Sequence, residues 1–108
     1  MSFIPQPCLS LQSGLIGCQG PSTVSTVGAS ITTVTIVAAN PDRCSLLIFN
    51  DSTSTLRIKW GMGASLNDYT LQISGNGTYT MEPPVVYTGI ITGIWDTANG
   101  DAHITEVT

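Results

Sequence analysis

The stretch RCSLLIFNDSTSTLRIKW, residues 43–60, decides the fold class of this chain. Residues 43–50 place apolar side chains on both faces of an extended backbone, which is typical of a central strand covered on both sides. Residues 51–54 are polar and predict a turn. Residues 55–60 alternate strictly between apolar and polar side chains, so they predict a second strand with one buried face. The apolar positions are Cys44, Leu46, Leu47, Ile48 and Phe49 in the first strand and Leu56, Ile58 and Trp60 in the second.

Similar strand patterns occur at short intervals on either side. The expected strands are Ile31–Ala38, Arg43–Asn50, Thr55–Trp60, Tyr69–Ile73, Thr78–Met81, Val85–Thr88, Ile90–Trp95 and Asp101–Val107. Ser74-Gly75-Asn76-Gly77 predicts a hairpin, because Asn-Gly accepts positive φ. Pro83-Pro84 predicts an edge or a strand that changes sheets. Seven or eight short antiparallel strands predict an all-β domain, either a small β-sandwich or a small barrel. The short connections favour a meander with one or two crossings.

Residues 1–28 differ from the rest, because they hold three of the six prolines, four of the eleven glycines and no charged residue. A free tail in water is normally polar and charged. We therefore expect an extended N-terminal arm that docks on a partner or a neighbouring subunit by adding a β-strand. Residues 29–108 would form the β-sandwich or barrel domain, and a chain that begins near Ser30 is expected to fold. The residues expected to bind the partner are Phe3, Ile4, Leu9, Leu11, Leu15 and Ile16.

The composition indicates a surface that faces other protein. Only 9% of the residues are charged, against 42% that are hydrophobic, whereas a typical soluble domain carries about 25% charged residues. Three Lys and Arg residues are too few to neutralise a row of phosphates, so no nucleic-acid partner is expected. The longest apolar run, residues 46–49, is far too short to span a membrane, and no membrane partner is expected.

The cysteines, Cys8, Cys18 and Cys44, are odd in number and irregularly spaced, and they contain no Cys-x-x-Cys metal pair. The favoured interpretation is three small buried thiols in a protein made in the cytosol. A bridge between Cys8 and Cys18 is the alternative.

The titratable residues do not predict an enzyme. His103 is the only histidine, and a catalytic triad needs a nucleophile, a base and an orienting carboxylate within reach of one another. Asp101 and Glu106 lie near it in sequence, but Asp101 is expected about 7 Å away along the same strand face. Asp96, Asn99 and Asp101 lack the glycine and terminal glutamate of a calcium loop. We therefore expect no catalytic residue, no metal site and no cofactor.

The aromatic residues Trp60, Trp95, Tyr69, Tyr79 and Tyr87 offer another possible site, a platform for sugar stacking. Trp60, Tyr69 and Tyr79 fall on the inward positions of their expected strands. Packing in the core is therefore the favoured role for these three side chains.

From residue 39 to the end, the chain resembles a family of small tailed-bacteriophage virion proteins of the head decoration (cement) type. The residues that carry the resemblance are Ala39-Asn40-Pro41-Asp42-Arg43, Leu46-x-Ile48-x-Asn50-x-Ser52, Leu56-x-Ile58 with Gly61, Gly77-x-Tyr79-x-Met81, Tyr87-Thr88-Gly89, Gly93-Ile94-Trp95 and Ala98-x-Gly100-x-Ala102-x-Ile104-Thr105-Glu106.

The resemblance implies a β-rich protein without enzymatic activity, present in several copies per virion and assembled in the host cytoplasm. It also implies binding to the major capsid protein or to other virion proteins, and a homo-oligomer, with a trimer favoured. In this interpretation the N-terminal arm clamps neighbouring subunits. The alternative is a receptor- or glycan-binding β module displayed on a virion or cell surface.

Overall fold

A computed structural model of the chain describes residue 18 and residues 20–108. This part is all-β, as predicted, with eight strands and no helix. Accordingly, it contains no helix long and apolar enough to cross a membrane. The six arm residues between Phe3 and Ile16 lie outside the described residues. The strands are β2 (Ser22–Gly28), β3 (Val34–Val37), β4 (Ser45–Asp51), β5 (Leu56–Trp60), β6 (Leu71–Ile73), β7 (Thr78–Met81), β8 (Ile91–Trp95) and β9 (Asp101–Val107).

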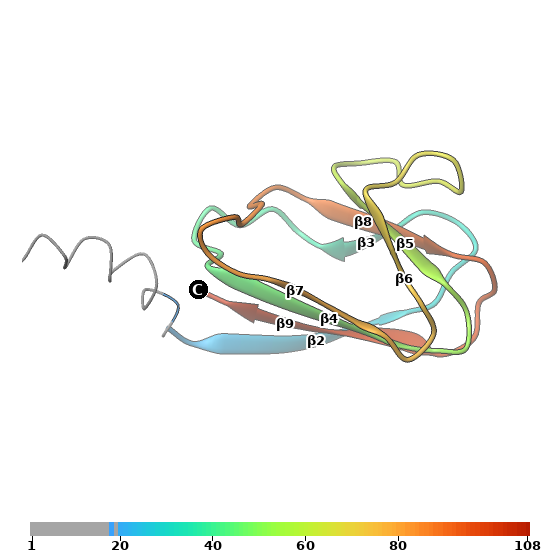
Figure 1. The fold of residues 1–108 in the computed structure, drawn as a ribbon, viewed down its shortest axis with the longest axis horizontal. Helices are drawn as coiled ribbons and strands as arrows, with labels where there is room; N and C mark the ends of the chain where they lie inside the picture. The colour runs from blue at the N-terminus through green and yellow to red at the C-terminus, as the bar shows by residue number, and fades with distance from the viewer. Residues whose placement is uncertain (1–17, 19) are drawn as a thin grey trace, which may run out of the picture.

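The strands form two four-stranded antiparallel sheets, which lie as two layers in Figure 1. The first sheet has the order β2-β9-β4-β7 and the second has the order β3-β8-β5-β6. When the chain is followed from β2 to β9, only the connection from β5 to β6 joins two strands of the same sheet. Every other connection crosses to the opposite sheet. The predicted meander with one or two crossings is therefore wrong. Asn76 has the positive φ expected at this turn, 62°, but the predicted hairpin is wrong, because the turn joins β6 and β7, which belong to different sheets.

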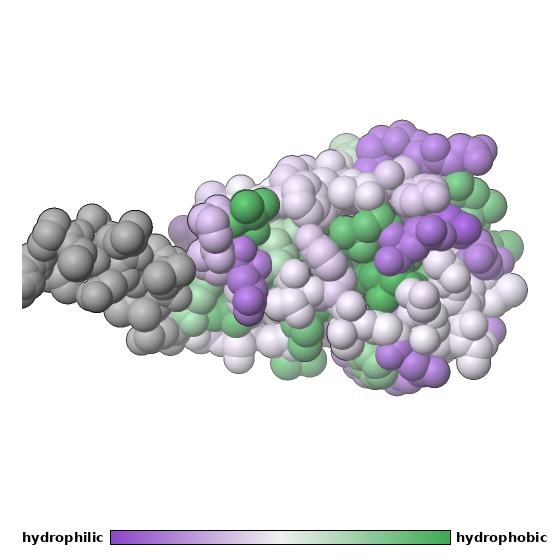
Figure 2. Space-filling model, in the orientation of Figure 1, coloured by the Kyte–Doolittle hydropathy of each residue, from purple (hydrophilic) through white to green (hydrophobic). Residues whose placement is uncertain are grey.

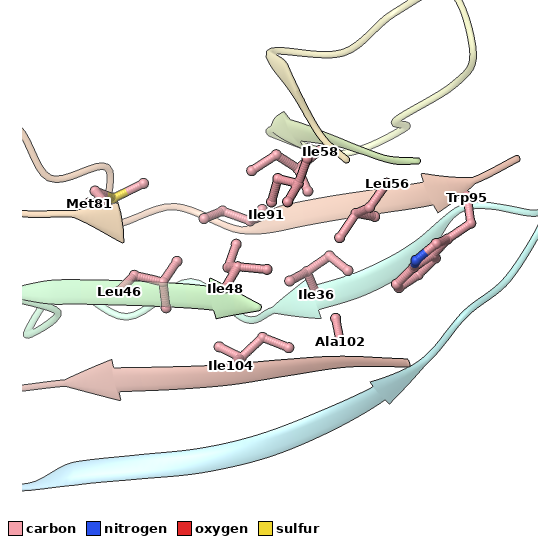
Figure 3. Close-up of a cluster of buried hydrophobic side chains, with 11 residues drawn as sticks. Ile36, Leu46, Ile48, Leu56, Ile58, Met81, Ile91, Trp95, Ala102 and Ile104 are labelled. Atoms are coloured by element: carbon pink, nitrogen blue, oxygen red, sulfur yellow. The ribbon is translucent and has the colours of Figure 1, made fainter. Parts of the chain in front are cut away.

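The core lies between the sheets and is built from alternate residues of the strands. Figure 3 shows these side chains pointing toward one another from both layers. Burying apolar surface of this kind contributes roughly 25 cal/mol per Å², so these side chains are what holds the two sheets together. The buried cluster comprises Ile36, Leu46, Ile48, Leu56, Ile58, Ile73, Met81, Ile91, Trp95, Ala102 and Ile104.

The buried Asn50 side chain joins the two sheets by hydrogen bonds at one end of this core. Its Oδ1 accepts from the Trp95 Nε1–H group at 3.0 Å and from the Ser52 hydroxyl at 2.8 Å. Its Nδ2 donates to the carbonyls of Ser54 and Ile73, at 2.8 and 2.9 Å. One amide on β4 thus satisfies polar groups from β6, β8 and the loop after β4.

The buried Arg43 guanidinium ties together the other end. It donates to Glu106 at 2.8 Å and to the carbonyls of Tyr87, Gly89 and Ala38 at 2.7, 3.1 and 2.6 Å. The expected strand Val85–Thr88 does not form. The segment instead follows a turn closed by the Val85 N–H bond to the Glu82 carbonyl, and Arg43 takes the carbonyl of Tyr87.

Residues 22–28 correct the expected boundary between arm and domain. They form β2, which pairs with β9 along its whole length, from Ser22 opposite Val107 to Gly28 opposite Asp101. The sheet therefore begins at Ser22, and not at residue 29. A chain that starts near Ser30 would lack an entire strand of the first sheet and would leave one edge of β9 unpaired.

The preference for three free thiols is also corrected, because Cys18 and Cys44 form a disulfide, with 5.3 Å between their Cα atoms. Ser22 of β2 and Ser45 of β4 both lie beside Val107 of β9. The segments that lead into β2 and β4, which contain Cys18 and Cys44, therefore meet at the same end of the first sheet. The pairing follows from this tertiary arrangement, which the spacing of the cysteines does not reveal.

Asn50→Ala is expected to lower the free energy of unfolding by about 3 kcal/mol, because it leaves several buried donors and acceptors without partners. Chemical denaturation measures this loss. The exposed Asn67 in the loop after β5 provides a matched control, and Asn67→Ala is expected to change the stability by less than about 0.5 kcal/mol. Equal effects of the two substitutions would contradict the role assigned to Asn50.

Peptide mapping without a reducing agent is expected to recover a peptide that links Cys18 to Cys44. Reduction is expected to destabilise the fold by about 3 kcal/mol, since the bond closes a segment between cysteines 26 positions apart. A peptide linking Cys8 to Cys18, or no linked peptide from freshly purified protein, would contradict the pairing.

Candidate interaction surface

The first sheet has one face that the described chain leaves largely uncovered. Leu46, Ile48 and Asn50 of β4 point into the core, so Leu47 and Phe49 point the other way. Leu47 is 38% exposed and Phe49 is half-buried. The expectation that this strand is covered on both sides is therefore not met within the described residues: β4 is central in its sheet, but only its inner face is packed.

Cross-strand pairing arranges the uncovered side chains in rows. One row is Val24, Thr105, Leu47 and Thr80, and the next row is Thr26, His103, Phe49 and Thr78. We call these residues, together with Ser22, Ser45 and Val107, the outer face. It contains no lysine, arginine, aspartate or glutamate. Figure 2 shows that the strongly hydrophilic residues on the visible side of the molecule lie in separate clusters, with most of the surface between them pale or green.

The next row on the same side of the sheet adjoins the outer face and brings the carboxylates of Asp51 and Asp101 close to His103. His103 Nε2 is 3.0 Å from Asp51 Oδ2 and 3.3 Å from Asp101 Oδ1. Its Nδ1 is 3.4 Å from the Thr26 hydroxyl, and its ring stacks on Phe49 with 6.1 Å between centroids. Asp101 thus reaches His103, contrary to the expected separation along the strand. Asp51 carries no sequence signal that links it to His103; the pairing of β4 with β9 places it opposite Asp101.

This cluster offers donor atoms that suit a divalent cation, all within 4.8 Å of one another. The imidazole of His103 contacts both carboxylates directly, and all three side chains are partly exposed. The order Thr26, His103, Asp51 resembles a catalytic relay, but acyl transfer also needs preorganised donors for an oxyanion. Of these parts, the described residues show the contact of Thr26 with His103 and the contact of His103 with Asp51.

The other carboxylates considered in the sequence have separate partners. Glu106 points inward to Arg43, and Asp96 pairs with Arg57 in the second sheet. The Asn99 side chain accepts from the Thr53 amide at 3.3 Å. Asp96 and Asn99 therefore each make a contact outside the cluster around His103. A shallow hollow of about 330 Å³ lies nearby, lined by Asp51, Ser52, Thr53, Asn76, Asn99 and Gly100.

The aromatic residues only partly follow the expected inward orientation. Trp60 is half-buried and stacks on Tyr87, with 5.3 Å between centroids. Tyr79 packs against the core, and this burial raises the pKa of its hydroxyl. Tyr69 is 37% exposed and lies under the Arg57 guanidinium. Its predicted inward position is wrong, because β6 begins only at Leu71. The hydrogen bond with Asp96 raises the pKa of Arg57.

Comparisons of the chain with protein-family models, with curated proteins and with solved structures find no match. The residues and their arrangement are therefore the basis for any functional proposal.

Proposed function

We propose that this chain is a non-enzymatic structural protein of a virus particle, of the capsid-decoration (cement) type, and that it binds its particle through the outer face. The observation that carries the proposal is the outer face itself, where Val24, Leu47 and Phe49 are exposed or half-buried among threonines on a hydrogen-bonded sheet. Apolar side chains grouped on an exposed face typically mark an interaction site. The resemblance to phage decoration proteins suggests the kind of particle.

The character of the outer face fits a contact between proteins. The centres of protein interfaces are poor in charge and rich in apolar and aromatic groups. Leu47 and Phe49 lie on β4, a central strand paired on both sides, so binding requires little ordering of the backbone there. Such a rigid platform suits a protein that stabilises an assembly by contact alone.

The disulfide supports a role outside the reducing cytosol. Disulfides persist in oxidising surroundings and are rare where glutathione keeps thiols reduced. A virion released from its host meets these conditions, although the protein would be assembled in the host cytoplasm. The six apolar residues of the predicted arm would add a second anchor, and that part of the proposal rests on the sequence alone.

Leu47→Glu is expected to weaken binding to particles assembled without this protein by at least tenfold, because it places a charge within the contact. The fold should be retained, since Leu47 is already 38% exposed. The measurement is co-sedimentation of the purified protein with particles over a range of concentrations.

Leu66→Glu provides the matched control, because Leu66 is 51% exposed in the loop after β5 and lies outside the outer face. This variant is expected to bind particles as well as the natural chain does. The outer face is not the binding site if both variants bind normally or lose binding equally. Binding of the isolated protein to a glycan array, without binding to particles, would favour the receptor-type alternative.

A further inference from the structure

Among the residues that the structure describes, none pairs with the outer edge of strand β2. This strand is the first in the order β2-β9-β4-β7, so only one of its two edges is paired. Its seven residues, STVSTVG, pair with β9 in one continuous register without a bulge. All of these residues except Val27 are exposed.

The ladder bonds at the two ends of β2 show which backbone groups face the open side. Ala29 donates to the Gly100 carbonyl at 3.0 Å, and Thr108 donates to the Pro21 carbonyl at 3.1 Å. In an antiparallel pair, every second residue bonds to the neighbouring strand and those between point away from it. The residues whose N–H and C=O groups point to the open edge are therefore Ser22, Val24, Thr26 and Gly28.

The other three sheet edges carry features that discourage pairing, and β2 carries none of them. Natural proteins protect edges by short strands, bulges, prolines and charges. Strand β6 has only three residues. Strand β3 has four residues and a register shift between Thr35 and Val37. Strand β7 has four residues and is followed by Glu82, Pro83 and Pro84.

We propose that two copies of this chain associate by pairing β2 with β2 in antiparallel orientation about a two-fold axis. The two first sheets then form one continuous sheet, and the two outer faces form one larger platform. The partner is a second copy of this chain. An open edge pairs with another open edge, and among the four edge strands described here only β2 lacks protective features, so the edge that a second copy offers is its own β2. An interface in which both copies use the same surface is complete with two subunits, so it gives a closed dimer.

The strand sequence fits this arrangement. With the axis at Ser25, Ser22 lies opposite Gly28 of the second copy and Val24 lies opposite Thr26, so all four outward-pointing residues meet outward-pointing partners. About eight backbone hydrogen bonds would form, two for each bonded pair. No charged side chain lies on β2. Asp101 lies beside Gly28, and antiparallel pairing places the two copies of this end about 20 Å apart.

This inference goes beyond the proposed function, because it does not depend on what the outer face binds. It also differs from the trimer favoured by the sequence. The first test is sedimentation of the full chain and of Val24→Pro. The N–H of Val24 points away from β9, so a proline there removes an edge donor and keeps the ladder to β9. We expect a dimer for the natural chain and association at least tenfold weaker for Val24→Pro.

Val24→Thr keeps the edge N–H and is expected to dimerise normally. If Val24→Pro fails to fold, Val24→Lys replaces it, since a lysine on an edge strand also discourages pairing. A natural chain that stays monomeric at high micromolar concentration, or that forms a trimer, would overturn the proposal. So would a dimer that neither Val24→Pro nor Val24→Lys weakens.

The position of the axis provides an independent test by crosslinking, in a Cys8→Ser background. Residues opposite each other in a non-bonded antiparallel pair lie close enough for a disulfide. Ser25→Cys is therefore expected to give a covalent dimer on mild oxidation. Thr23→Cys, which would face Val27 of the second copy, is expected to remain uncrosslinked. Equal crosslinking of both variants, or of neither, would exclude this register.

Discussion

The amide of Asn50 is the contact on which one end of this molecule depends. Two sheets that pack face to face form no backbone ladder with each other, so hydrogen bonds between them come from polar side chains that cross the core. Asn50 crosses it at Trp95, the largest fully buried side chain. The backbone of Asn50 also accepts from the amide of Asn76 and donates to the carbonyl of Gly77. The turns that line the hollow beside Asp51 are thereby connected to one residue.

Strands β4, β5 and β9 could be predicted largely from alternation, because their buried positions recur at every second residue, whereas all five residues of β8 are buried. Strand β2 was missed for a physical reason. Its valines, Val24 and Val27, are three positions apart and fall on opposite faces, so its sequence has no period of two. It is ordered by pairing with β9, and tertiary pairing leaves no local signal. The same holds for the crossings between sheets and for the disulfide from Cys18 to Cys44.

The candidate surface was predictable only in part. Alternation places Leu47 and Phe49 on one face of β4, but whether that face is covered depends on the rest of the fold. Asp101 and His103 were recognised as sharing a face of their strand. Asp51 joins them only through the register of β4 on β9. The segment around Tyr87 looked like a strand, yet the buried Arg43 takes its carbonyl, and a buried arginine has no signature in a single sequence.

The ion pairs have a consequence for the surface as a whole. Each lysine or arginine contacts an acid: Arg43 with Glu106, Arg57 with Asp96, and Lys59 with Asp68. The chain has three Lys and Arg residues and seven Asp and Glu residues. The three ion pairs therefore leave four carboxylates without a Lys or Arg partner, which accounts for the net charge of −4. These four are Asp42, Asp51, Glu82 and Asp101. The charge left over is thus entirely negative, and copies that approach one another repel at long range. Dissolved salt screens this repulsion, so a close approach of two copies becomes easier as the ionic strength rises.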